Sequence, residues 1–201
     1  MSKPILIALT GKITSGKSYA ARILEDCGFL IVDLDVLARE VVAPPSKTLD
    51  ELVAGFGEEI LNEDKTLDRA RLAKRAFVNE DATKKLNDIL HPAIQNAFMH
   101  IYKTSTAPRL AVEIPLPEKA PWLLELCSEI IYIRAPYEVR KARAMQERGM
   151  DEADFERRDA LQAEDEVYEF YASAIFDNNT HTNDLEQALR TWLVKRGLCQ
   201  G

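Results

Sequence analysis

The sequence predicts an α/β fold with a parallel β-sheet core flanked by helices. Residues 5–9 form a continuous apolar run, which is typical of a strand buried on both faces of a sheet. Residues 18–26 carry apolar side chains at helical spacing, and residues 29–32 form a second apolar run. This strand–helix–strand order is typical of neighbouring parallel strands.

Three further strands and a closing helix are expected along the chain. Pro115 stops an apolar run at residues 110–114, and residues 130–133 form another such run. Residues 174–176 form a short strand that leads into a turn, and a helical pattern covers about residues 184–195.

Two stretches of the chain carry helical patterns without strand-like runs. Residues 46–103 follow the breaker Pro44-Pro45, and we interpret them as a helical insert. In this insert Asp68 and Asp81 are expected to cap helices, and Pro92 is expected to interrupt the second helix.

The second stretch, residues 137–171, is rich in charge, and Asp151 is placed to cap a short helix within it. We expect two short helices that form a mobile lid. One domain of 201 residues is therefore predicted, in which the core comprises residues 1–45, 104–136 and 172–201.

The composition excludes several classes of protein. The net charge of −7 argues against nucleic-acid binding through a generally cationic surface. Apolar runs near the N-terminus are too short for a membrane span or signal segment, so a cytoplasmic protein is expected. The three cysteines are far apart and form no C-x-x-C pair, so free thiols are expected. A monomer and a weak homo-oligomer both stay open.

Residues 11–18 read Gly-Lys-Ile-Thr-Ser-Gly-Lys-Ser and fit the phosphate-loop pattern G-x-x-x-x-G-K-S/T between a predicted strand and a predicted helix. Backbone N–H groups of such a loop bind phosphate oxygens, and the helix dipole favours anions. Lys17 is expected to reach the β- and γ-phosphates of ATP, and Ser18 to ligate Mg²⁺. The alternative is a glycine-rich turn with an exposed lysine. The candidate nucleotide-binding residues of the loop are Gly11, Lys12, Ile13, Thr14, Ser15, Gly16, Lys17 and Ser18.

Three carboxylates follow or lie on predicted strands. Asp33 and Asp35 stand at the carboxyl end of the second strand, where ligands bind in open α/β sheets. They are candidates for accepting a proton from an attacking hydroxyl or positioning Mg²⁺, and the alternative for either is capping the next helix. Glu113 is either a ligand of Mg²⁺-bound water or a buried, paired carboxylate.

Arginines of the predicted lid are candidates for stabilising a transferred phosphoryl group, with Arg143 and Arg148 favoured. The alternative is a solvated helix face. The chain contains neither N-K-x-D nor L-S-G-G-Q, which argues against GTPase switches and transport ATPases. No H-E-x-x-H pair occurs, so Mg²⁺ is the only metal implied.

The chain resembles the dephospho-CoA kinase family over nearly its whole length. This resemblance implies a P-loop NTPase fold with a helical CoA-binding insert and a lid. It also implies transfer of the ATP γ-phosphate to the ribose 3′-hydroxyl of dephospho-CoA. The stretches that carry it are residues 9–18, 32–35, 38–42, 56–61, 67–69, 90–92, 114–116 and 177–179.

The resemblance also implies roles for individual residues. Asp33 matches the catalytic base, Lys17 and Ser18 match the phosphate and Mg²⁺ ligands, and Arg143 falls on the lid arginine. Those that lie on the acceptor side are Asp35, Arg39, His91 and the strand end at Pro115, whereas Asn178 or Asn179 lies near the adenine.

The chain departs from the family pattern in two places. Lys12 and Thr14 stand where the family usually has glycine, and residues 117–121 replace the usual Leu-Phe-Glu. The leading hypothesis is an ATP- and Mg²⁺-dependent dephospho-CoA kinase. The alternatives are a kinase for another small alcohol and a non-catalytic ATP- or CoA-binding module.

Overall fold

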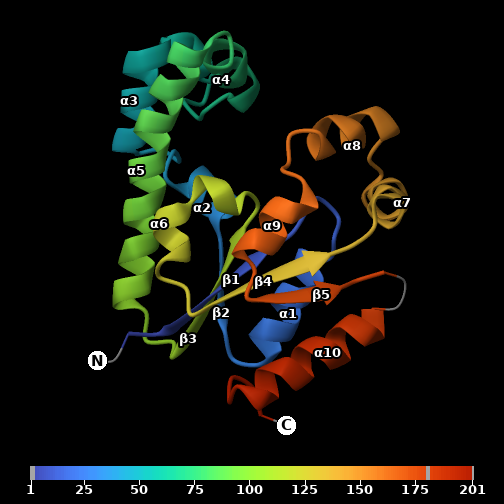
Figure 1. Ribbon diagram of the computed structural model, residues 1–201. Helices are drawn as coiled ribbons and strands as arrows, with labels where there is room; N and C mark the ends of the chain where they lie inside the picture. The colour runs from blue at the N-terminus through green and yellow to red at the C-terminus, as the bar shows by residue number, and fades with distance from the viewer. Residues whose placement is uncertain (1–2, 180–181, 201) are drawn as a thin grey trace. The chain divides into compact units, whose positions relative to one another are not determined.

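The computed structural model describes residues 3–179 and 182–200, and the chain divides into two compact units (Figure 1). Unit 1 comprises Met1–Val32 and Thr106–Gly201, and unit 2 comprises Asp33–Ser105. The predicted helical insert, residues 46–103, lies within unit 2. No helix of the described residues is both long and apolar enough to cross a membrane.

A five-stranded sheet in the order β2-β3-β1-β4-β5 forms the centre of unit 1. The pairs β1–β3, β1–β4 and β4–β5 are all parallel, as the apolar runs predicted. β1 is the middle strand, and its residues from Leu6 onward are buried. Its continuous apolar run fits this position, since helices cover both faces of the sheet. The strands are β1 (Ile5–Thr10), β2 (Leu30–Asp33), β3 (Arg109–Ile114), β4 (Glu129–Arg134) and β5 (Ala174–Asp177).

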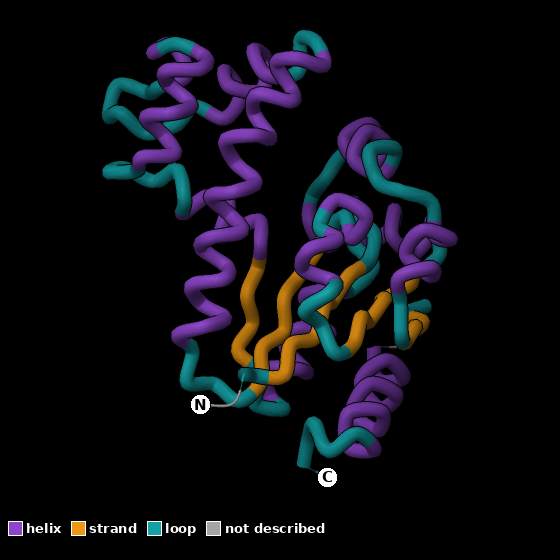
Figure 2. Tube along the Cα trace, turned by 60° about the vertical axis from the view of Figure 1, so that its left-hand side comes forward, coloured by secondary structure: helices purple, strands orange, loops and turns teal. Residues whose placement is uncertain are grey.

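Helices pack on both faces of this sheet (Figures 1 and 2). On one face, Ile7 and Ile131 share a core with Leu24 of α1 and Leu189 of α10. On the other face, Tyr132 stacks on Tyr168 of α9, with ring centroids 5.1 Å apart. The helices of unit 1 are α1 (Lys17–Asp26), α6 (Pro121–Leu124), α7 (Tyr137–Arg148), α8 (Glu152–Asp159), α9 (Asp165–Tyr171) and α10 (Thr182–Lys195), with a 3₁₀ turn at Pro117–Lys119.

The charged segment at residues 137–171 forms three helices, α7, α8 and α9, where two were expected. Asp151 caps α8 as predicted, since its side chain accepts a hydrogen bond from Asp154 N at 2.7 Å. Arg140 of α7 is only 3% exposed and forms an ion pair with Asp159 of α8. A periodic charge pattern does not reveal such a buried cation, because its partner lies on another helix.

Unit 2 is helical and has its own apolar core. Leu52, Phe56, Leu72 and Leu86, from three helices, pack together in this core. Asp68 caps α4 as predicted and accepts a hydrogen bond from Arg71 N at 2.9 Å. The helices are α2 (Leu34–Glu40), α3 (Lys47–Phe56), α4 (Arg69–Ala76) and α5 (Glu80–Thr104), with a 3₁₀ turn at Glu58–Ile60.

The longest helix, α5, corrects two expectations. It runs through Pro92 without interruption, and its N-cap is Asn79 rather than Asp81. A proline inside a helix costs about 3 kcal/mol. Burial of an apolar side chain such as Leu86 contributes about 1.5–3 kcal/mol, and several such side chains of α5 are buried, so packing outweighs the lost hydrogen bond.

The expectation of free thiols is wrong for two of the three cysteines, because Cys27 and Cys199 form a disulfide. They are separated by 172 residues, but the chain beyond α10 lies beside the end of α1. Arg109 holds the same two segments, donating to Cys27 O at 3.3 Å and to Gly197 O at 3.2 Å. Sequence spacing alone does not show this proximity. Disulfides are rare in cytosolic proteins, so this bond is unusual for the cytoplasmic protein that the sequence predicts.

Removal of the disulfide should destabilise the fold. We expect Cys199→Ser, or reduction of the wild type, to lower the free energy of unfolding by about 2–5 kcal/mol, since the bond closes a long loop. Denaturant unfolding with and without reductant measures this change. Cys127→Ser is the control, because burial raises the pKa of the free Cys127 thiol to about 12 and keeps it protonated. A wild-type midpoint that does not respond to reductant would contradict the prediction.

Candidate active site

The loop between β1 and α1 bends through two glycines in the left-handed region. Gly11 has φ 154° and Gly16 has φ 106°. A Cβ atom at Gly11 would lie 2.5 Å from the carbonyl oxygen of Ile133, and one at Gly16 would lie 2.1 Å from Asn178 Nδ2. Both positions therefore require glycine, for conformation and for space. The loop delivers the N-terminus of α1 with backbone N–H groups that need partners.

Thr14 adopts a left-handed conformation, with φ 56°, where the family usually has glycine. This conformation costs a residue with a Cβ about 1–2 kcal/mol. The Thr14 hydroxyl lies 2.6 Å from Arg140 O and 2.7 Å from Ile13 O, so it has a carbonyl acceptor although Thr14 is buried. Its hydrogen bonding offsets part of the backbone strain and ties the loop to α7.

Lys12, the second departure, is directed to carboxylates of segment 137–171. Its ammonium lies 3.1 Å from Asp165 and 3.7 Å from Glu164, and the residue is 8% exposed. Tyr132 donates a hydrogen bond to Asp165 at 2.9 Å. Burial raises the pKa of Asp165, but hydrogen bonds from Lys12 and Tyr132 outweigh it and hold the pKa below its usual value. The Lys12 side chain therefore forms an ion pair within the chain, and the contact of Lys12 with phosphate stays a prediction.

Two further interactions hold the loop. The Ile13 N–H donates to Oε1 of Gln162 at 2.6 Å. The Lys17 ammonium lies across the loop and donates to the carbonyl oxygens of Gly11 and, at 3.2 Å, of Lys12. Sequence reasoning missed Gln162 and Asp165 as partners of the loop. The one available signal was a lysine in place of glycine, which implies a partner without identifying it.

Asn178 connects the loop to Arg143. Asn178 follows β5, is 2% exposed, and donates through Nδ2 to Ser15 O at 2.8 Å. Arg143 Nη2 donates to Asn178 O at 3.0 Å and to Asn178 Oδ1 at 3.3 Å. Of the buried side-chain atoms that lack a hydrogen-bond partner within the described residues, two lie in this group, Ser15 Oγ and Arg143 Nη1. The structure therefore brings two predicted site residues, Asn178 and Arg143, together at the loop.

Other predicted residues of unit 1 lie at exposed or occupied positions. Arg148, the last residue of α7, is exposed, and so are Asn179 and Ser18. The carbonyl oxygen of Pro115 accepts a hydrogen bond from Tyr168 at 3.1 Å. Of these residues, Ser18 at the start of α1 is the one whose hydroxyl could bind a nucleotide-associated metal. Among residues 3–179 and 182–200 no group of three or more His, Cys, Asp or Glu side chains is arranged to hold a metal ion.

Asp33 is the predicted carboxylate with a defined structural role. It ends β2 and caps α2, where its Oδ1 accepts from Asp35 N at 2.7 Å and from Val36 N at 3.3 Å. Both bonds use Oδ1, so the cap does not require Oδ2. Asp33 is therefore the residue that caps α2. Asp35 and Arg39 are exposed on α2, and His91 is exposed on α5.

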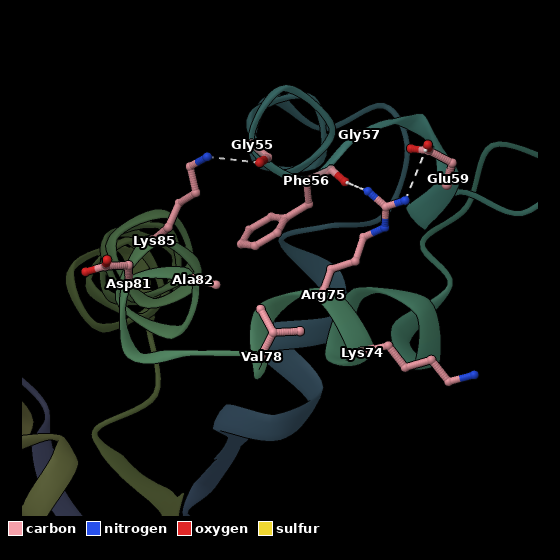
Figure 3. A pocket seen from close by; sticks show the side chains of 10 residues that line it. All are labelled: Gly55, Phe56, Gly57, Glu59, Lys74, Arg75, Val78, Asp81, Ala82 and Lys85. Atoms are coloured by element: carbon pink, nitrogen blue, oxygen red, sulfur yellow. Dashed lines mark hydrogen bonds and ion pairs between the residues drawn. The ribbon is translucent and has the colours of Figure 1, made fainter.

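Unit 2 also contains a pocket of about 770 Å³ (Figure 3). Arg75 donates to Phe56 O at 2.8 Å and pairs with Glu59 at 3.3 Å. Lys85 donates to Gly55 O at 2.9 Å and lies over the Phe56 ring. These two cations therefore cap the carboxyl end of α3, and Figure 3 shows Lys74 pointing away from the pocket. The pocket does not include a predicted site residue.

Comparisons with known proteins identify the family of the chain. The family model described as dephospho-CoA kinase matches residues 5–184. The chain belongs to the dephospho-CoA kinase family. A dephospho-CoA kinase of Corynebacterium diphtheriae is 35% identical over 188 residues, covering 92% of this chain and 94% of that protein. One of Corynebacterium glutamicum is 40% identical over 183 residues, covering 89% and 90%.

Several solved structures share the fold of this chain. The crystal structure of TT1252 from Thermus thermophilus is 31% identical, with a TM-score of 0.81, and covers 96% of this chain and 98% of that one. Dephospho-CoA kinase from Campylobacter jejuni has a TM-score of 0.65 over the whole of both chains at 24% identity. Shikimate kinase from Acinetobacter baumannii, with a TM-score of 0.53 and 18% identity over 96% and 94%, shares the fold alone. The predicted P-loop kinase fold is confirmed.

The glycine requirement of the loop can be tested with a matched pair of variants. Gly16→Ala should abolish measurable ATP binding, because the added Cβ would lie 2.1 Å from Asn178 Nδ2 at a positive φ, and relief of this clash would distort the backbone of the loop. Gly28→Ala is the control. Gly28 also has a positive φ, 83°, but no atom lies within 4 Å of its added Cβ, so we expect a loss of only about 1–2 kcal/mol in stability. Calorimetric titration with ATP and thermal unfolding measure both effects. Equal ATP affinity of the two variants would contradict the role of Gly16.

Proposed function

We propose that this protein transfers the γ-phosphate of ATP to the ribose 3′-hydroxyl of dephospho-CoA, which yields ADP and CoA. The observation that carries the proposal is the phosphate loop at residues 11–18, in a chain that belongs to the dephospho-CoA kinase family over residues 5–184. We place this reaction in the cytoplasm, with ATP and dephospho-CoA as the small-molecule partners and without a nucleic-acid partner.

At the nucleotide end, the N-terminus of α1 and the loop amides would bind the phosphate oxygens. Lys17 would exchange the loop carbonyls for the β- and γ-phosphates, and Arg143 Nη1, buried without a partner among the described residues, would gain an anionic acceptor. The exposed hydroxyl of Ser18 would ligate the Mg²⁺ that accompanies ATP. When bound, this ion neutralises charge on the phosphate oxygens. The unsatisfied Arg143 Nη1 is a cationic donor and fits a phosphate oxygen of ATP.

At the acceptor end, Asp33 would take the proton of the ribose 3′-hydroxyl. At the same time the oxygen of that hydroxyl forms a bond to the γ-phosphorus. The bond from that phosphorus to the β–γ bridging oxygen breaks, and ADP leaves with the electron pair. The cap on Oδ1 fixes the Asp33 carboxylate and leaves Oδ2 for the proton. Exposed Asp35, Arg39 and His91 would contact the acceptor, and Arg148 and Asn179 the nucleotide.

The altered segment at residues 117–121 favours a second candidate acceptor. Within the described residues, Glu118 Oε2 is buried without a hydrogen-bond partner, which suits a ligand hydroxyl or N–H donor. Glu118 lies in the 3₁₀ turn that follows β3. Another small alcohol with such donors is therefore the alternative acceptor.

A direct assay tests the proposed acceptor. Purified protein with ATP, Mg²⁺ and dephospho-CoA should form CoA and ADP in equal amounts, as measured by chromatography. A panel of nucleosides and sugar alcohols should yield ADP only at the rate of an acceptor-free control. Lack of CoA formation, or faster ADP formation with another alcohol, would contradict the assignment.

The role of Asp33 is separable from its cap. Asp33→Asn should lower kcat by at least about 10²-fold, the usual contribution of general-base catalysis, since the amide oxygen still caps α2 but does not accept the proton. Asp151→Asn, which changes the N-cap of α8 in the same way, should leave kcat within a factor of about two of the wild type. Comparable turnover of both variants would remove Asp33 from the base role.

A further inference from the structure

Asn178 uses both the donor and the acceptor of its side-chain amide to connect two parts of the site. Its Nδ2 donates to Ser15 O at 2.8 Å, and its Oδ1 lies 3.3 Å from the donating Nη2 of Arg143. An amide is a side chain with a donor and an acceptor on one rigid plane, so it can bridge a carbonyl and a guanidinium. Aspartate lacks the donor, and an apolar side chain lacks both groups.

The backbone of Asn178 fixes this bridge to the sheet. The Asn178 N–H donates to Arg134 O at 2.7 Å, and its own carbonyl accepts from Arg143 Nη2 at 3.0 Å. Arg143 is therefore held twice by the same residue. The absence of a Cβ at Gly16 is what allows the Asn178 side chain to approach the loop.

The guanidinium of Arg143 is held by Asn178 at one of its two terminal nitrogens. Nη2 is engaged by Asn178, whereas Nη1 is buried and has no hydrogen-bond partner among the described residues. Leaving a buried cationic donor unsatisfied is unfavourable unless a ligand completes it. Ser15 Oγ, in the residue that Asn178 holds, is also buried without a partner in the described chain. An anion at the loop would supply acceptors for such donors.

We propose that Asn178 is a positioning residue for phosphoryl transfer, which holds Arg143 so that Nη1 faces the transferred phosphoryl group. This inference rests on the proposed kinase function. It assigns Asn178 a role different from contact with adenine, because both ends of its amide are occupied and the residue is 2% exposed. Negative charge on the transferred group is redistributed in the transition state, where the fixed guanidinium interacts with it most strongly.

A double-mutant cycle of Asn178→Ala and Arg143→Ala tests this role. Arg143→Ala should lower kcat by about 10³-fold, as for arginines that stabilise phosphoryl transfer. Asn178→Ala should lower kcat by about 10- to 100-fold, the range of coupling between residues in contact, with KM for ATP changed less than about threefold. In the Arg143→Ala background, Asn178→Ala should change kcat by less than about threefold, because its effect runs through Arg143.

A merely structural Asn178 gives different results. Its effect would multiply with that of Arg143→Ala, or KM for ATP would rise while kcat is unchanged, and either outcome overturns the proposal. Asn178→Asp serves as the second variant and should keep more turnover than Asn178→Ala, since its carboxylate still accepts from Nη2. Asn62→Ala, which removes an exposed asparagine, is the matched control and should retain wild-type kcat.

The cycle separates this inference from the proposed function. If the wild type phosphorylates another alcohol rather than dephospho-CoA, the acceptor assignment fails and the cycle run with that alcohol still tests Asn178. If no alcohol is phosphorylated, the kinase function fails, and the cycle is run on ATP hydrolysis. In either case, independent effects of the two substitutions contradict the coupling, and non-additive effects support it.

Discussion

The close packing of Gly16 against Asn178 is the contact on which the arrangement of the candidate site depends. Gly16 has a positive φ, and the space of its missing Cβ is filled by the Asn178 amide. This contact closes the loop between the central strand β1 and the helix α1. It also brings the residue after β5 to the loop, so one buried side chain connects distant parts of the chain. The geometry of the site therefore depends on the order of the strands, which places Asn178, as well as on the sequence of the loop.

Charge at the site is controlled by local pairing rather than by the net charge of −7. Lys12 is neutralised by Asp165 and Glu164, and Lys17 donates to loop carbonyls. Arg143 uses one terminal nitrogen on Asn178 and has the other unsatisfied within the described residues. An acidic protein can thus present a few cations to a phosphate group, because the surrounding carboxylates and carbonyls fix their positions.

Local signals predicted much of the structure, and contacts between distant segments were the parts that the sequence did not reveal. The apolar runs and the caps at Asp68 and Asp151 depend on neighbouring residues, and the structure confirms them. The disulfide of Cys27 depends on how α10 packs on α1, and the partner of Lys12 is one acid among many. The passage of α5 through Pro92 depends on packing that outweighs a local preference. For the site itself, the motif identified the loop but not the residues that hold it.

A crystal structure with a non-hydrolysable ATP analogue and dephospho-CoA would show which side chains contact the γ-phosphate and the ribose 3′-hydroxyl. We expect a γ-phosphate oxygen to accept a hydrogen bond from Arg143 Nη1 while Asn178 still holds Nη2. We also expect the ribose 3′-hydroxyl to lie about 2.6–3.2 Å from the Asp33 carboxylate. A γ-phosphate bound without Arg143, with the 3′-hydroxyl held by a different group, would contradict both expectations.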